Sequence, residues 1–212
     1  MSTYLSEDEQ VAQLKKLWKD YGWSTLIAVA VGLAISYGWH FWKNRQLEIR
    51  YQASNGYEHL LLAQEQNDTA QVQKITDNLK QHFSHTPYAG FAALIAAKQA
   101  VDDNHLDKAL AQLTWVVQHA KLSATRQIAR NRKARILLAQ HKPQAALQQL
   151  KKIDDASFSS AVEVIKGDAY MALKQTTKAK HAYGEALTHY PSDLGSRLIV
   201  ERQFHQLPAK EA

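Results

Sequence analysis

The ten histidines are the side chains of this sequence best suited to acid–base catalysis or metal binding. His82 and His85 stand three residues apart beside a predicted loop, and no carboxylate is placed at ligand spacing from them. His181 and His189 are eight residues apart on a predicted helix. A zinc-binding helix of the peptidase type needs the pattern His-Glu-x-x-His, which the sequence lacks. The histidines therefore do not predict a metal site, and a hydrolase built on His82 and His85 is the weakest functional hypothesis.

The other patterns that support catalysis are also missing. The sequence has no cysteine, no glycine-rich phosphate-binding loop and no Gly-x-Ser-x-Gly nucleophile elbow. Its paired carboxylates, Asp102-Asp103 and Asp154-Asp155, stand at predicted helix boundaries, where helix capping explains them. We therefore expect no catalytic residue, no cofactor, no metal and no small-molecule substrate.

A formal net charge of +6 raises the question of an anionic partner. The densest basic cluster lies in a predicted helix, where positions 126, 130 and 133 share one face. Aromatic residues, which would stack on the bases of a nucleic acid, are not interleaved with it. We interpret the cluster as a solvated helix face and expect no nucleic-acid partner. Its members are Arg126, Arg130, Arg132, Lys133 and Arg135.

The composition predicts that helices position any functional residue. Glycine (8 residues) and proline (4 residues) are scarce, which disfavours a β-sandwich or barrel with many tight turns. Alanine, leucine, glutamine and lysine are abundant, and all four favour helices. Hydrophobic residues make up 45% of the chain, enough for an ordinary core. The predicted fold class is all-α.

Residues 21–42 contain no Asp, Glu, Lys or Arg. About 20 helical residues span the hydrocarbon core of a bilayer, and aromatic residues at both ends of this stretch suit the two interfaces. A cleaved signal peptide has a shorter apolar region and a small-residue cleavage site, whereas this stretch ends in Trp-His-Phe-Trp. We predict a retained transmembrane helix in contact with membrane lipid. The aromatic residues are Tyr21 and Trp23 at one end and Tyr37, Trp39, Phe41 and Trp42 at the other.

The flanks of the predicted span leave its orientation open. Three basic residues precede it and three follow it, so the positive-inside count does not decide. In residues 1–20, Ser6 and Glu9 form a capping-box pattern, and Val11, Leu14, Leu17 and Trp18 recur at helical spacing. These residues predict a short amphipathic tail helix.

Three small residues, Ala28, Gly32 and Ser36, are spaced by four within the predicted span. Such a stripe allows two helix backbones to approach closely in lipid, so a partner helix can pack there. Small residues are also common in membrane helices for no such reason. The sequence leaves both interpretations open.

The polar part of the chain, residues 43–212, contains an internal repeat. Ala109, Ala146 and Ala179 begin similar apolar patterns and are separated by 37 and 33 residues, which is typical of tetratricopeptide helix pairs. The last repeat fits that consensus best, although Glu163 and Lys166 depart from it. Its predicted packing residues are Gly167, Tyr170, Ala179, Tyr183, Ala186 and Pro191.

The predicted helices follow from the same periodicity. The first can continue the span over 44–66, and a terminal helix over 192–205 would cap the stack. Together the elements predict a single N-terminal transmembrane helix followed by a tetratricopeptide-like helical-repeat domain, an α-solenoid. The remaining helices are predicted over 70–83, 87–101, 106–119, 124–140 and 143–152, followed by a last pair containing Phe158 to Ala172 and Ala182 to Leu187.

Four segments, taken in order, resemble the ancillary SecYEG translocon subunit family. They are Asp8-Glu-Gln-Val-Ala-Gln-Leu-Lys15, the end of the span Gly38-Trp-His-Phe-Trp42, Pro87-Tyr-Ala-Gly-Phe-Ala-Ala-Leu94, and Lys166-Gly-Asp-Ala-Tyr170. The resemblance covers nearly the whole chain and is weakest over 196–212.

This resemblance implies a function that the composition does not show. It implies the inner membrane of a Gram-negative bacterium, with the tail 1–20 in the cytoplasm and the repeat domain in the periplasm. The implied partners are the SecYEG translocon and a membrane-anchored periplasmic chaperone of the peptidyl-prolyl isomerase type. The expected function is a non-catalytic adaptor that links translocated proteins to periplasmic chaperones. The alternative is a regulatory or envelope-assembly scaffold that acts through the cytoplasmic tail.

Overall fold

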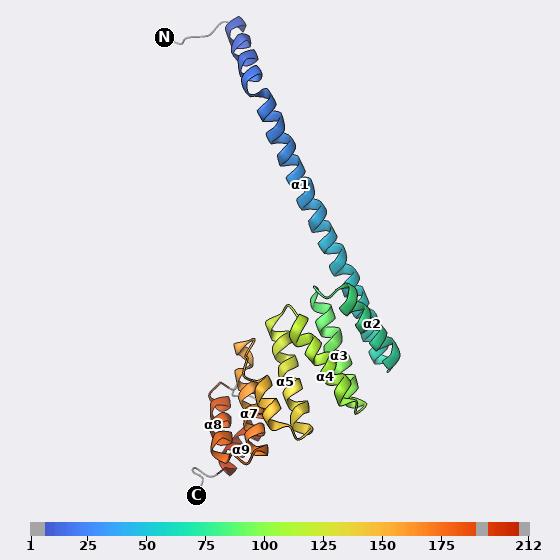
Figure 1. Cartoon of the computed structure of the whole chain (residues 1–212), viewed down its shortest axis with the longest axis vertical. Helices are drawn as coiled ribbons and strands as arrows, with labels where there is room; N and C mark the ends of the chain where they lie inside the picture. The colour runs from blue at the N-terminus through green and yellow to red at the C-terminus, as the bar shows by residue number, and fades with distance from the viewer. Residues whose placement is uncertain (1–6, 190–194, 208–212) are drawn as a thin grey trace. The chain divides into compact units, whose positions relative to one another are not determined.

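The computed structural model describes residues 7–189 and 195–207, and this part of the chain is helical throughout, without strands (Figure 1). The predicted all-α class is therefore confirmed. The chain divides into two compact units between Tyr51 and Gln52.

The first unit is formed by the greater part of a single helix, α1 (Glu7–Glu65). The predicted tail helix is not a separate element, because α1 runs from Glu7 through the predicted span without a break. Ser6, the predicted cap, lies outside the described residues. By length and composition α1 is able to cross a membrane, and the apolar stretch that qualifies it has no buried residue within the structure.

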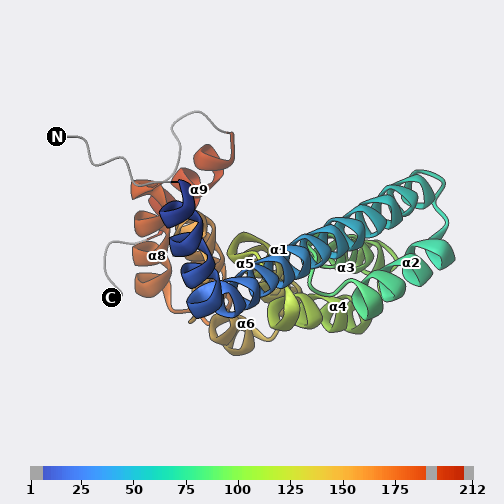
Figure 2. The ribbon, with the colours of Figure 1, turned by 90° about the horizontal axis from the view of Figure 1, so that it is seen from above.

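The second unit is a stack of helix pairs that begins with the last turns of α1. Consecutive helices pack against each other, so that α2, α3 and α4 lie side by side in chain order (Figures 1 and 2). The elements are α2 (Thr69–His82), α3 (Pro87–Asp102), α4 (Leu106–His119), α5 (Ser123–Ala139), α6 (Pro143–Gln149), the 3₁₀ turn η1 (Ala156–Phe158), α7 (Ser159–Ala172), α8 (Thr176–Thr188) and α9 (Gly195–Gln206).

Four turns between paired helices share one backbone design. Their C′ residues have positive φ, between 56° and 60°, and none of them is glycine. At each turn the next residue donates its backbone N–H to the carbonyl five residues earlier, as in a Schellman motif. The four residues, spaced by 37, 37 and 33 positions, are Asn67, Asn104, His141 and Lys174.

This spacing defines four repeats, one more than the sequence pattern predicts. The additional repeat is the first, formed by the end of α1 and by α2. Val72, fully buried, stands there at the position that Ala109 occupies in the second repeat. A search for alanine at this position therefore misses the first repeat, because valine occupies the buried position there.

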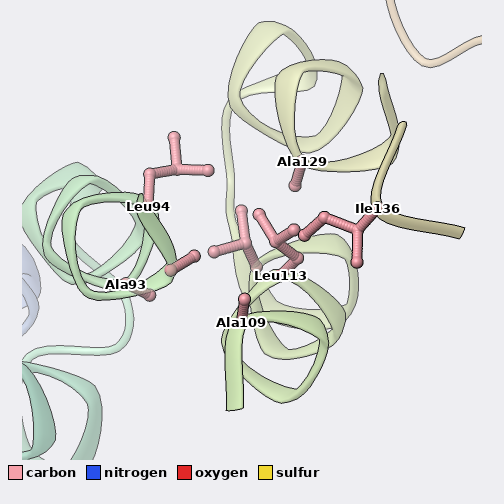
Figure 3. Packing of buried hydrophobic residues seen from close by; sticks show 8 residues of the cluster. Ala93, Leu94, Ala109, Leu113, Ala129 and Ile136 are labelled. Atoms are coloured by element: carbon pink, nitrogen blue, oxygen red, sulfur yellow. The ribbon is translucent and has the colours of Figure 1, made fainter. Parts of the chain in front are cut away.

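Alanine lines much of the interior of the stack, which lets neighbouring helices approach closely. Between α3, α4 and α5, Leu113 points into the shared interior toward Ala129 and Ile136 (Figure 3). Ala93 and Ala109 are fully buried in the same cluster. Burying a leucine of this kind contributes roughly 2–3 kcal/mol to folding.

The predicted helix boundaries hold with a few differences. The helix predicted over 143–152 ends at Gln149, which leaves α6 with seven residues. Ala172, which we expected to lie on the apolar stripe of this helix, is exposed, whereas Gly167 is buried. Phe158 belongs to η1 rather than to the following helix. Pro87 occupies the first turn of α3, where proline needs no hydrogen-bond donor, as predicted.

Candidate functional site

The best-preserved repeat is held by the contact between Gly167 on α7 and Tyr183 on α8. Tyr183 is 1% exposed, and a β-carbon placed on Gly167 would lie only 2.6 Å from its Cδ1 atom. The Tyr183 hydroxyl donates a hydrogen bond of 2.8 Å to Oδ1 of Asp168. Glycine at 167 is therefore required for the tyrosine ring to enter the space between the two helices.

Burial and charge perturb both groups of this hydrogen bond. Burial raises the pKa of the Tyr183 hydroxyl, and its bond to Asp168 and the charge of that residue raise the pKa further. Burial also raises the pKa of the Asp168 carboxyl, against the opposing effects of the hydrogen bond from Tyr183 and the charge of Arg135. The pair is a structural element inside the repeat.

The remaining predicted packing residues of this repeat can be placed with one exception. Ala179 and Ala186 are fully buried beside Tyr183, and Tyr170 packs partly buried against the same cluster. The ammonium of Lys178 lies 5.8 Å from the centre of the Tyr170 ring. Pro191 lies outside the described residues.

Every repeat has a pair of residues equivalent to Gly167 and Tyr183, and the two members of each pair are sixteen residues apart in the sequence. Where the first member of a pair is smaller, the second member is larger. By this register leucine corresponds to the smaller threonine in the first repeat, alanine to leucine in the next two, and glycine to tyrosine in the last. All eight residues are buried, and the pairs are Leu60 and Thr76, Ala97 and Leu113, Ala134 and Leu150, and Gly167 and Tyr183.

The basic cluster of α5 is tied into the scaffold, so its interpretation as a solvated face is wrong for most members. Nε of Arg130 lies 2.6 Å from Oδ2 of Asp154, whose side chain is 3% exposed. Nε of Arg126 lies 3.5 Å from Oδ1 of the same carboxylate. Lys133 donates a 3.0 Å hydrogen bond to the Thr114 hydroxyl. Sequence periodicity missed these contacts because Asp154 is at least 24 residues from the two arginines and Thr114 is 19 residues from Lys133.

Asp154 also joins the segment after α6 to α5 through its backbone. Its backbone N–H donates to Oε1 of the buried Gln127 at 2.7 Å, which fixes the segment after α6 on α5. Burial alone would raise the pKa of the Asp154 carboxyl. The hydrogen bond from Arg130 and the charges of Arg130, Lys152 and Arg126 outweigh that effect and lower the pKa.

Among the paired carboxylates, only the side chain of Asp155 caps a helix N-terminus, where it accepts a 3.0 Å hydrogen bond from the N–H of Ser157. Asp102 lies at the end of α3 and pairs with Lys98 at 2.5 Å. Asp103 is the C-terminal cap residue of α3. Among the described residues no group of three or more His, Asp or Glu side chains is arranged to hold a metal ion.

Equivalent positions near the ends of three first helices carry apolar side chains at the surface. Val101 on α3 and Met171 on α7 are each 39% exposed, and Leu138 on α5 is half-buried. Because they are spaced by 37 and 33 residues, they occupy the same register in successive repeats. Stacked repeats of this kind create extended surfaces for protein partners. Sequence analysis did not single out this row, although the repeat spacing contains it.

The small residues of α1 are exposed along one face. Ala28, Gly32 and Ser36 recur every four residues, and apart from the local backbone of α1 no atom comes within 4 Å of a β-carbon placed on Gly32. The stripe is thus open to a partner helix, and its occupation stays a prediction.

The similarity to known proteins extends over both units of the chain. The family model of the tetratricopeptide repeat-like domain matches residues 15–209. A protein of Neisseria gonorrhoeae named ancillary SecYEG translocon subunit is 29% identical over 98% of this chain and 100% of its own. Proteins of the same name from Haemophilus influenzae and Escherichia coli are 27% and 25% identical, over 88% and 86% of this chain and 91% and 88% of theirs.

The chain belongs to this tetratricopeptide repeat-like family of ancillary SecYEG translocon subunits. The family is non-catalytic, which confirms the expectation that the protein is not an enzyme. The family and the one helix of the described residues that is long and apolar enough to cross a membrane together indicate a membrane protein. No solved structure matches the chain.

Proposed function

We propose that this protein is a membrane-anchored, non-catalytic ancillary subunit of the SecYEG translocon. The observation that carries the proposal is the alignment with the Neisseria gonorrhoeae relative, which extends over 98% of this chain and so includes both the apolar helix and the repeats. A match confined to the repeats would have indicated a scaffold of any function. A match that includes the helix favours a common place of action in the membrane.

The proposal extends to topology and to a role beside periplasmic chaperones. The tail 1–20 lies in the cytoplasm and the repeats in the periplasm, where they bind translocated proteins and a membrane-anchored chaperone of the peptidyl-prolyl isomerase type. The resemblance supports this arrangement. The apolar row Val101, Leu138 and Met171 offers a surface on which an extended apolar segment can bind.

The topology is tested by fusing a reporter enzyme after Ala212. A reporter that folds only in the periplasm should be active, and a matched reporter that works only in the cytoplasm should be inactive. The reverse pattern would exclude a periplasmic repeat domain and with it the chaperone-linking role.

The partners are tested by affinity purification of the tagged full-length chain from detergent-solubilised membranes. Recovery of the translocon and a periplasmic chaperone is expected, and recovery of neither would refute the adaptor. Deleting residues 1–20 while keeping the span separates the adaptor from the alternative scaffold. The adaptor should keep its periplasmic partners, whereas a scaffold acting through the tail should lose its regulator.

The stripe on α1 provides a second surface for the same complex. Gly32→Leu should weaken recovery of the translocon, because a leucine side chain keeps a neighbouring backbone away. Gly38→Leu is the matched control, since Gly38 also has no neighbour within 4 Å but is not on the stripe. Equal recovery of the two variants would mean that the stripe is not a packing surface.

A further inference from the structure

A groove of about 540 Å³ runs along α1 where the charge-free stretch begins. It follows one face of the helix, since its central members recur at spacings of three and four residues. Its lining residues are Lys15, Leu17, Trp18, Tyr21, Gly22 and Thr25.

The groove depends on the glycine at its floor. Gly22 is buried although its neighbours on α1 are exposed, because the Trp18 indole folds back over it. A β-carbon on Gly22 would lie 3.0 Å from Cδ2 and 3.2 Å from Cε2 of that indole. The hydroxyl of Thr25 donates to the carbonyl oxygen of Tyr21 at 2.9 Å, so the deep end of the groove presents little free polarity.

The chemistry of the lining changes along the groove in one direction. Lys15 supplies a cation at the end away from the span, the rings of Trp18 and Tyr21 follow, and Gly22 and Thr25 enter the apolar stretch. Asp20 precedes Gly22 by two residues, which turns it about 200° around the helix, to the opposite side. The cationic end of the groove is therefore not neutralised by that carboxylate.

This order matches a phospholipid from its phosphate to its acyl chains. Ammonium groups attract lipid phosphates, indole and phenol rings favour the interfacial layer, and the indole that packs over Gly22 presents apolar surface toward the span. We propose that the groove is a binding site for one anionic phospholipid, with its headgroup at Lys15 and an acyl chain along the Trp18 indole and Thr25. The site goes beyond the translocon association and does not depend on it.

The test is native mass spectrometry of the full-length chain in detergent with added phosphatidylglycerol or phosphatidylcholine. Phosphatidylglycerol should be retained with a stoichiometry of one and in preference to phosphatidylcholine. Lys15→Gln should lower its retention about fivefold, the factor that corresponds to the roughly 1 kcal/mol that a basic residue contributes at an anionic surface. Lys16→Gln is the matched control, because it removes the same charge from the adjacent position but does not line the groove.

Two glycine variants separate the groove from general electrostatics. Gly22→Leu should displace the indole and lower retention without changing the charge, whereas Gly38→Leu should leave it unchanged. Equal effects of Lys15→Gln and Lys16→Gln, or equal retention of the two lipids, would overturn the proposal. It would also be overturned if Gly22→Leu abolished recovery of a membrane-protein partner and left phosphatidylglycerol retention unchanged, since the groove would then hold a helix.

Discussion

Replacing Gly167 by alanine tests the central packing argument of the repeat domain. On an open helix the change would stabilise the protein by up to about 1 kcal/mol, because alanine favours helix more than glycine does. Here the added carbon would lie 2.6 Å from Cδ1 of Tyr183, well inside van der Waals contact. The ring is buried and cannot rotate away without losing its hydrogen bond to Asp168. We expect a net destabilisation of about 1–2 kcal/mol, because overpacking of a core typically costs about 1–3 kcal/mol and the gain in helix propensity offsets only part of that cost.

The second repeat supplies the compensating change. Its equivalent residues are Ala97 and Leu113, which pack in one cluster. Tyr183→Leu alone should cost about 3 kcal/mol, because it removes ring contacts and leaves the buried Asp168 without its donor. In the double variant the leucine leaves room for the new methyl group. The double variant should therefore be more stable than the sum of the single effects predicts, by about 2 kcal/mol.

The assay is urea unfolding of the full-length chain in detergent, followed by circular dichroism at the helical band. Gly184→Ala is the control, because its β-carbon would approach Phe204 only to 3.3 Å and so should cost much less. Additive single effects, or an unchanged stability of Gly167→Ala, would refute the idea that the sizes of the two positions are matched.

Three further predictions concern other parts of the stack. Thr76→Val should stabilise the chain by about 1–2 kcal/mol in urea unfolding, because the fully buried Thr76 hydroxyl has no hydrogen-bond partner among the described residues; a loss of stability would mean that the hydroxyl is satisfied. Lys174→Gly should stabilise by about 0.5 kcal/mol in the same assay, because glycine relieves the positive φ of 59° but adds freedom to the unfolded chain; Lys178→Gly, inside α8, should destabilise instead. Asp154→Asn should cost about 2 kcal/mol at neutral pH by weakening the charged hydrogen bond from Arg130. Because the pKa of Asp154 is lower in the folded than in the unfolded state, its carboxylate contributes fully to stability at pH values above the unfolded pKa near 3.8. This contribution disappears as the pH falls through the folded pKa, so the wild type and the variant should converge in stability on acidification. Parallel curves of stability against pH would contradict this.

Local pattern predicted most of this fold because the evidence for it is local. The charge-free stretch 21–42 and the alanines at Ala109, Ala146 and Ala179 are visible without knowledge of any tertiary contact. The first repeat was missed because its close-packing positions carry Leu60 and Val72 rather than small residues. Larger side chains are fully buried at these positions of the first repeat. Only the turn at positive φ shows that the first repeat is equivalent to the other three.

Contacts distant in sequence were beyond the reach of periodicity. Arg130 and Asp154 come together only because α6 ends early and the following segment returns to α5. The groove beside Trp18 was likewise hidden, because Trp18 and Gly22 were each interpretable as ordinary members of an amphipathic tail and a span. Its signal was the spacing of Lys15, Trp18, Gly22 and Thr25 along one helix face.

The inverse sizes at the paired positions also bear on how a repetitive chain avoids folding incorrectly. Similar helix pairs compete for each other's partners, and exchange between equivalent elements is a characteristic failure of repeat proteins. Here α3, with Ala97, would collide with Tyr183 if it paired with α8, whereas α7, with Gly167, would leave a void against Leu113 of α4. The two helices of the last repeat thus fit each other better than either fits the equivalent helix of the second or third repeat, both of which pair alanine with leucine. The departures from the common pattern in the last repeat therefore favour its correct pairing during assembly.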